Sequence, residues 1–239
     1  MAKRGKVKLE IISPENEEKM ELERPARVKR YGYIILVVCE DIKTEVKYFN
    51  GFISEELKDH LYLKSVGTGE NSLGVVQQAV AERATFNSRF RKEVDETWAV
   101  FDKDDLDQSD GNRLRFESAF TLGTKEEVSI AYSNESFELW LLLHFARIDP
   151  SVALGRREIE KQLQEVVKGY LGYDTFQYVH GDDQIITILF EIGSESDAIE
   201  RAESLLEFHG QTSLIAANPS TTVYKLINSI RGWIDYFSD

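Results

Sequence analysis

The stretch that decides the fold is YIILVVC at residues 33–39, which is followed at once by Glu40 and Asp41. It is a continuous apolar run with four β-branched residues. Such a run is typical of a strand buried on both faces of a parallel sheet. A helix is expected next, over residues 44–59, where Thr44 can cap the start and apolar side chains recur at three- and four-residue steps, at Val46, Phe49, Phe52 and Ile53.

The alternation of strand and helix continues along the chain. Further strands are expected at 61–66, 97–101 and 128–132, and helices at 73–92, 111–122 and 135–145. This order predicts right-handed crossovers and an α/β fold, an open sheet of about four mainly parallel strands flanked by helices. After Pro150 the pattern predicts helices at 156–171, 184–191, 195–209 and 220–237. We therefore expect three parts: a mobile arm over 1–30, an α/β core over 31–148, and a helical C-terminal extension packed on the core over 149–239.

The amino-acid composition limits the classes of protein to which this chain can belong. Of the 239 residues, 42% are apolar and 30% are charged, which is typical of a globular chain. The single cysteine, Cys39, excludes an intrachain disulfide and a cysteine-clustered zinc site, so a reducing, cytoplasmic location is expected. The apolar runs are far shorter than the roughly 18 residues of a membrane span, and the first residues do not resemble a signal peptide.

The net charge of −13 disfavours binding of nucleic acid by bulk charge alone. The charge is unevenly distributed, because residues 1–30 hold nine basic and six acidic side chains, whereas the remainder holds 20 and 36. The basic arm is either a solvated tail or a tether that reaches a phosphate backbone.

Carboxylates follow the expected strands. Glu40 comes directly after the first strand, and Asp102 and Asp104 come directly after the third. Ligands bind outside the carboxyl ends of parallel strands, and carboxylates gathered there repel one another unless a cation lies between them. Oxygen ligands favour Mg²⁺ or Mn²⁺ over zinc. The nearby Asp105, Asp107 and Asp110 are interpreted as turn and solvation residues.

Glu138 stands in the apolar stretch FELWLLL at residues 137–143. Burial of an unpaired carboxylate costs several kcal/mol, so this side chain needs a cation, either a bound metal ion or an arginine or lysine. An interaction with the positive end of its helix is the other interpretation. Asp102, Asp104 and Glu138 are thus the candidate metal ligands.

Other polar residues are candidates for phosphate contacts. In a phosphodiester-cleaving site Glu40 would accept the proton of the attacking water, and Lys43 would supply positive charge, unless it is a solvated surface residue. Asn218, Ser220 and Thr221 offer amide and hydroxyl donors to nucleic acid before the last helix. Alternatively, these residues cap the start of the last helix, beside Pro219.

The motif of Glu40, Asp102-x-Asp104 and a later Ser-x-Glu resembles the Toprim domain of topoisomerases, bacterial primases and OLD-type nucleases. More closely, the chain resembles the RloB family, in stretches that span about 34–226. The matching stretches are ILVVCE with KTE and YF, FDKDD, SN with FELWLLLHF, and NPSTT with KL.

The resemblance implies a Toprim-like fold and a metal-dependent nuclease of bacterial anti-phage defence or abortive infection. Its relatives occur near restriction loci, and some have a partner ATPase. In Toprim nucleases the residue matching Glu40 is a general base or metal ligand, and those matching Asp102 and Asp104 bind Mg²⁺. DNA and RNA both stay open as substrates, as does assembly into a homo-oligomer. Asp41 stands where such sequences usually have glycine, and it either crowds the site or adds a ligand.

Two other function classes fit part of the pattern. A receiver-like phosphorylation switch also has acidic residues after its first and third strands, but it needs a lysine after a fifth strand. A non-catalytic adaptor would keep the acidic site as a remnant and bind nucleic acid or a partner ATPase. Asp41 is compatible with the adaptor.

Overall fold

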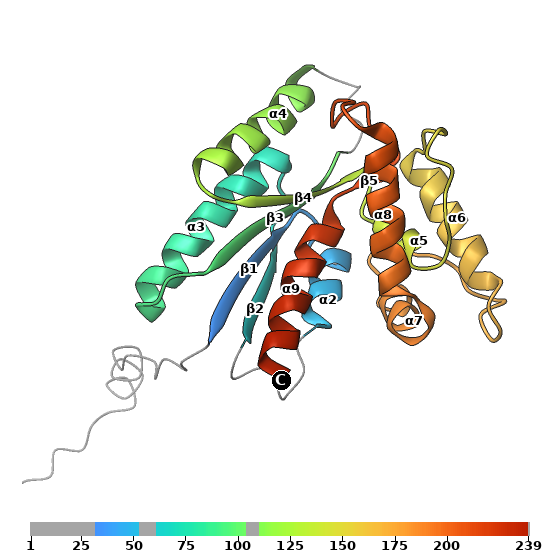
Figure 1. Ribbon diagram of the computed structural model, residues 1–239, viewed down its shortest axis with the longest axis horizontal. Coiled ribbons are helices and arrows are strands. Elements are labelled where there is room, and N and C mark those ends of the chain that lie inside the picture. The colour runs from blue at the N-terminus through green and yellow to red at the C-terminus, as the bar shows by residue number, and fades with distance from the viewer. Residues whose placement is uncertain (1–31, 53–60, 104–109, 239) are drawn as a thin grey trace, which may run out of the picture. The chain divides into compact units, whose positions relative to one another are not determined.

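A computed structural model describes residues 32–52, 61–103 and 110–238 of the chain. The predicted basic arm, Ile53, Asp104, Asp105 and Asp107 lie outside these residues. The described part forms one sheet with the strand order β2-β1-β3-β4-β5 (Figure 1). The strands are β1 (Tyr33–Cys39), β2 (Leu61–Gly67), β3 (Glu96–Asp102), β4 (Ser129–Asn134) and β5 (Ser220–Thr221).

The first four strands run parallel, which confirms the predicted α/β class. The fifth was not expected. β5 lies where the sequence predicted the start of the last helix, and it pairs antiparallel with β4 through Ser133–Thr221 and Asn134–Ser220. Thr222 follows it, so the lysine of a receiver-like site is not present there.

Helices cover both faces of the sheet (Figure 1). α3 (Ser72–Phe90) and α4 (Asp110–Lys125) pack on one face, and α2 (Thr44–Asn50) and α9 (Val223–Ser238) on the other. Alternate residues of β1 supply the two apolar layers, Leu36 and Val38 toward α3 and α4, and Ile35, Val37 and Cys39 toward the opposite side. The two-sided burial expected from the apolar run is therefore present.

The remaining helices are α5 (Glu138–Leu143), α6 (Arg156–Lys168), α7 (Gln184–Ile192) and α8 (Glu195–His209). All six residues of α5 are buried, and α5 packs against both α6 and α8. Side chains from β1, α5, α6, α8 and α9 belong to one hydrophobic cluster. The helices after residue 149 thus share their core with the sheet.

Asp41, rather than Thr44, caps the start of α2. Its Oδ2 accepts a hydrogen bond from the Thr44 backbone N–H at 2.6 Å, and its own N–H donates to Glu45 Oε2 at 3.1 Å. The Thr44 hydroxyl is buried and makes no hydrogen bond to the described residues, so the expected cap by Thr44 is wrong. A residue with a carboxylate at position 41 therefore has a structural use that glycine could not serve.

None of the helices in the described part of the chain combines the length and the apolar character that crossing a membrane requires.

Candidate functional site

The first group of site residues lies at the carboxyl ends of β1 and β3, which are adjacent parallel strands. Glu40 follows β1, and Asp102 is the last residue of β3. The Asp102 backbone N–H donates a hydrogen bond to Glu40 Oε2 at 3.0 Å. The structure therefore brings these two predicted residues together, as the strand-end argument required.

Glu45 joins this group and was not singled out from the sequence. It comes from the first turn of α2, and only 1% of it is exposed. Burial raises the pKa of Glu45 well above 4.5, and the nearby charges of Asp102 and Glu40 raise it further. Its position at the start of the helix that follows Glu40 was the available signal. We name Glu40, Glu45 and Asp102 the strand-end cluster.

Arg156, the first residue of α6, links the strand-end cluster to Glu138. Its Nη2 donates to Asp102 Oδ2 at 3.0 Å, and its Nη1 lies 3.8 Å from Glu138 Oε2. Sequence reasoning required a cation for Glu138, either a metal ion or a basic side chain. Arg156 is a basic side chain that meets this requirement.

Glu138 is 1% exposed and is held by two further side chains. The Tyr178 hydroxyl donates to Glu138 Oε1 at 2.5 Å, and His180 Nδ1 lies 3.0 Å from the same oxygen. Burial by itself would raise the pKa of Glu138, but these hydrogen bonds and Arg156 outweigh it and lower the pKa to about 2. The hydrogen bond to Glu138 in turn raises the pKa of His180.

Glu160, one turn along α6 from Arg156, completes a second group. One ligand atom from each of Glu138, Glu160 and His180 lies within 4.8 Å of the others. Across residues 32–52, 61–103 and 110–238, no other set of three or more acidic, histidine or cysteine side chains meets this criterion. Neither His180 nor Glu160 was predicted, because no motif marks them.

Of the predicted nucleic-acid contacts, Ser220 and Thr221 are buried and Asn218 is half-buried. Asn218 Oδ1 accepts from the Leu154 N–H at 2.9 Å, and its Nδ2 donates to the Leu154 carbonyl at 3.0 Å. Ser220 and Thr221 are fully buried, and their hydroxyls donate to backbone carbonyls of Ala217 and Tyr132. These contacts favour a structural role for the three residues. Nucleic-acid binding by them stays a prediction.

Lys43 is exposed and borders the second group. Its side chain packs against Gly181, where an added Cβ would lie 2.7 Å from Lys43 Cδ. Gly181 has a φ of +78°, so both its conformation and this approach favour glycine. Lys43 therefore lies against Gly181, the residue that follows His180 in the sequence.

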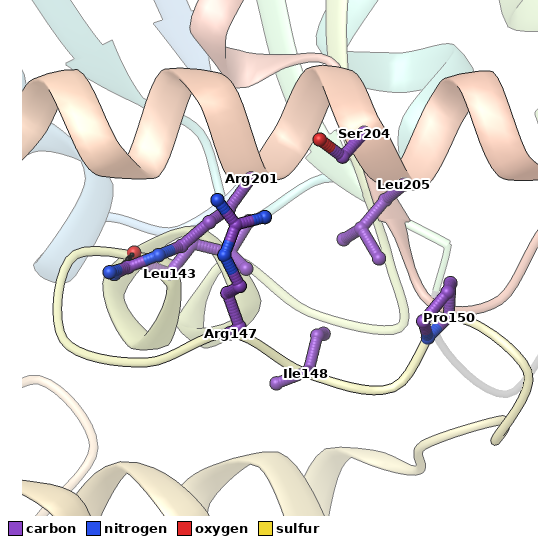
Figure 2. Close-up of a pocket in the computed structure, with 7 residues that line it drawn as sticks. All are labelled: Leu143, Arg147, Ile148, Pro150, Arg201, Ser204 and Leu205. Carbon is purple, nitrogen blue, oxygen red and sulfur yellow. Dashed lines mark hydrogen bonds between the residues drawn. The ribbon is translucent and has the colours of Figure 1, made fainter.

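A small cavity elsewhere in the fold is a weaker candidate (Figure 2). It has a volume of about 220 Å³, and its lining comes from α8 and from the chain around the end of α5. Its two arginines are already engaged: Arg201 binds the Leu143 carbonyl and Asp197, and Arg147 binds Glu200. Ligand pockets usually exceed about 300 Å³. We therefore place the site at the two acidic groups.

A comparison with protein families finds a match to the model of the RloB-like protein family over residues 35–230. This range includes the strand-end cluster, Arg156 and the group of Glu138, Glu160 and His180. Neither the curated proteins nor the solved structures include a significant match to the chain.

Proposed function

The chain belongs to the RloB-like family, and from that premise we propose that it is a divalent-metal-dependent nuclease of bacterial anti-phage defence or abortive infection. The observation that carries the proposal is the strand-end cluster. A buried glutamate, Glu45, lies close enough to Glu40 and Asp102 for their charges to raise its pKa. Such an arrangement costs free energy unless protons or a cation compensate it.

The chemistry of this donor set fits a hard dication. The cluster offers carboxylate oxygens at adjacent strand ends, which suits Mg²⁺ or Mn²⁺. Asp102 and Asp104 are the proposed ligands, Asp104 lying outside the described residues. Glu138, the third ligand expected from the sequence, lies on the far side of the Arg156 bridge, and we do not include it in this site.

When bound, Mg²⁺ would neutralise the charge that develops on a phosphodiester during hydrolysis. Glu40 would accept the proton of the attacking water at its carboxylate, which the Asp102 N–H holds in place at 3.0 Å. Arg156 orients Asp102 through the Nη2–Oδ2 hydrogen bond. Lys43, which is exposed and follows Glu40 by three residues, would bind a substrate phosphate oxygen.

The test is cleavage of plasmid, single-stranded DNA and total tRNA with Mg²⁺ or Mn²⁺. Glu40→Gln is expected to lower the cleavage rate about a hundredfold or more, because proton transfer by a positioned side chain contributes at least that factor. Asp102→Asn should have a similar effect. Glu93→Gln and Asp235→Asn change exposed carboxylates outside the site and serve as matched controls. Equal cleavage by the parent and both site variants would refute the assignment.

The adaptor remains a second candidate, and the Arg156–Asp102 ion pair favours it. A guanidinium on Asp102 Oδ2 provides in part the positive charge that a metal ion would bring. An adaptor would bind nucleic acid or a partner ATPase without hydrolysis. The adaptor would be supported if calorimetry shows that the protein binds Mg²⁺ but plasmid, single-stranded DNA and total tRNA all stay uncleaved, with or without a partner ATPase.

A further inference from the structure

We propose that Glu138, Glu160 and His180 bind a divalent transition-metal ion such as Zn²⁺, at a site separate from the strand-end cluster. We name these three residues the histidine site. They come from α5, α6 and the segment before α7, so the fold must assemble them.

The geometry of the histidine site suits a single ion. Glu138 Oε1 and His180 Nδ1 are 3.0 Å apart, and one atom of each of the three residues lies within 4.8 Å of the others. Ligands about 2.1 Å from a tetrahedral zinc ion lie roughly 3.4 Å from one another. Small side-chain movements would therefore bring all three residues onto one ion.

Some of the proposed ligand atoms make few contacts with other residues and can therefore bind an ion. Glu138 Oε2 is buried and accepts no hydrogen bond of ordinary geometry from the described residues, while the nearby Ser136 hydroxyl helps to lower the pKa of Glu138. Arg156 Nη1 is 3.8 Å away from Glu138 Oε2, beyond hydrogen-bond distance, while Arg156 Nη2 donates to Asp102. The half-buried Glu160 carboxylate makes no hydrogen bond or ion pair within the described part of the chain. Two carboxylates therefore face a histidine with few competing donors.

The kind of ligand indicates the kind of metal. An imidazole nitrogen with two carboxylates favours zinc or another first-row transition ion over Mg²⁺, which prefers oxygen. Two carboxylates and a neutral imidazole balance the charge of a dication. The ion would take the place of the proton between His180 Nδ1 and Glu138 Oε1. Tyr178, which donates to Glu138 at 2.5 Å, would hold that ligand in place from the outer shell.

The test is titration of the chelator-treated full chain with ZnCl₂ by calorimetry, without nucleic acid. We expect one zinc ion per chain at the histidine site, in addition to any zinc that binds at the strand-end cluster. Glu160→Gln and His180→Ala should each weaken binding tenfold or more, because even outer-shell losses cost 10–100-fold in affinity. X-ray absorption at the zinc edge should show imidazole scattering in the parent protein, and His180→Ala should abolish it.

Glu158→Gln, on the same helix, and His209→Ala are the matched controls, and both should bind zinc as the parent does. His180 is half exposed, with 49% of its side chain accessible, so its loss leaves the core intact. Equal zinc affinity in the parent and both site variants would overturn the proposal, as would no binding at millimolar zinc. Glu40→Gln should leave zinc binding at the histidine site unchanged while it lowers the cleavage rate about a hundredfold or more, so this proposal and the nuclease can fail independently.

Discussion

The Arg156 guanidinium donates to the Asp102 carboxylate with 3.0 Å between Nη2 and Oδ2, across 54 residues of sequence. The same guanidinium lies 3.8 Å from the buried Glu138. One side chain from α6 therefore connects the carboxyl end of β3 to the start of α5. Arg156 therefore lies between the strand-end cluster and the histidine site.

Arg156→Gln should destabilise the protein by about 2–4 kcal/mol. Removal of one partner of a buried ion pair typically costs about 3–5 kcal/mol, and the estimate is reduced because 33% of the Arg156 side chain is exposed. Urea unfolding at neutral pH measures the loss. The exposed Arg157→Gln is the control, and an equal effect of both substitutions would show that the bridge adds nothing specific.

Glu45→Gln should stabilise the metal-free protein at pH 8 and have less effect at pH 5. The folded protein holds the Glu45 proton above the ordinary pKa of 4.5, so the folded state binds more protons than the unfolded state. The stability that Glu45 contributes is fully present below pH 4.5, and it is lost as the pH rises through the pKa that Glu45 has in the folded protein. Glutamine removes this loss and can still accept the hydrogen bond from the Asp41 N–H.

The midpoint of thermal unfolding at the two pH values provides the measurement for Glu45, with the exposed Glu93→Gln as the matched control. A Glu45→Gln variant that melts below the parent at pH 8 would contradict the expected sign.

Asn218→Ala should lower the free energy of unfolding by about 1–3 kcal/mol. The substitution leaves the Leu154 N–H and carbonyl without their side-chain partner, and removes a third hydrogen bond, to Glu135 at 3.3 Å. Chemical denaturation, with the exposed Asn228→Ala as control, measures the change. Loss of nucleic-acid affinity with unchanged stability would instead support the contact role predicted from the sequence.

Asp41→Ala should cost about 1 kcal/mol, because the Thr44 N–H at the start of α2 loses its acceptor. Asp41→Asn keeps a side-chain oxygen there and should cost clearly less. Denaturant unfolding of the pair distinguishes capping from charge. Equal losses in both variants would indicate that the carboxylate charge, rather than its acceptor oxygen, matters.

The parts of the fold that depend on local pattern were predictable. The apolar run at 33–39 indicated β1, and the position of Glu40 and Asp102 after their strands placed them together, because parallel strands end at one edge. β5 was missed because two residues have no periodicity of their own and are set by pairing with β4. Arg156, Tyr178 and His180 were missed for a similar reason, since only long-range packing of α6 and of the segment before α7 against α5 brings them to Glu138.

The antiparallel pairing of β5 with β4 also bears on how the chain acquires its structure during synthesis. The ribosome completes β1 to β4 before it makes β5 and α9, so the rim of β4 and the apolar face beneath α9 stay uncovered in the nascent polypeptide. Val223, Leu226, Ile227 and Ile230, all buried, are translated after β1 to β4. Native packing of the sheet therefore requires α9 to have been synthesised, and until then the nascent chain exposes apolar surface that a chaperone can bind.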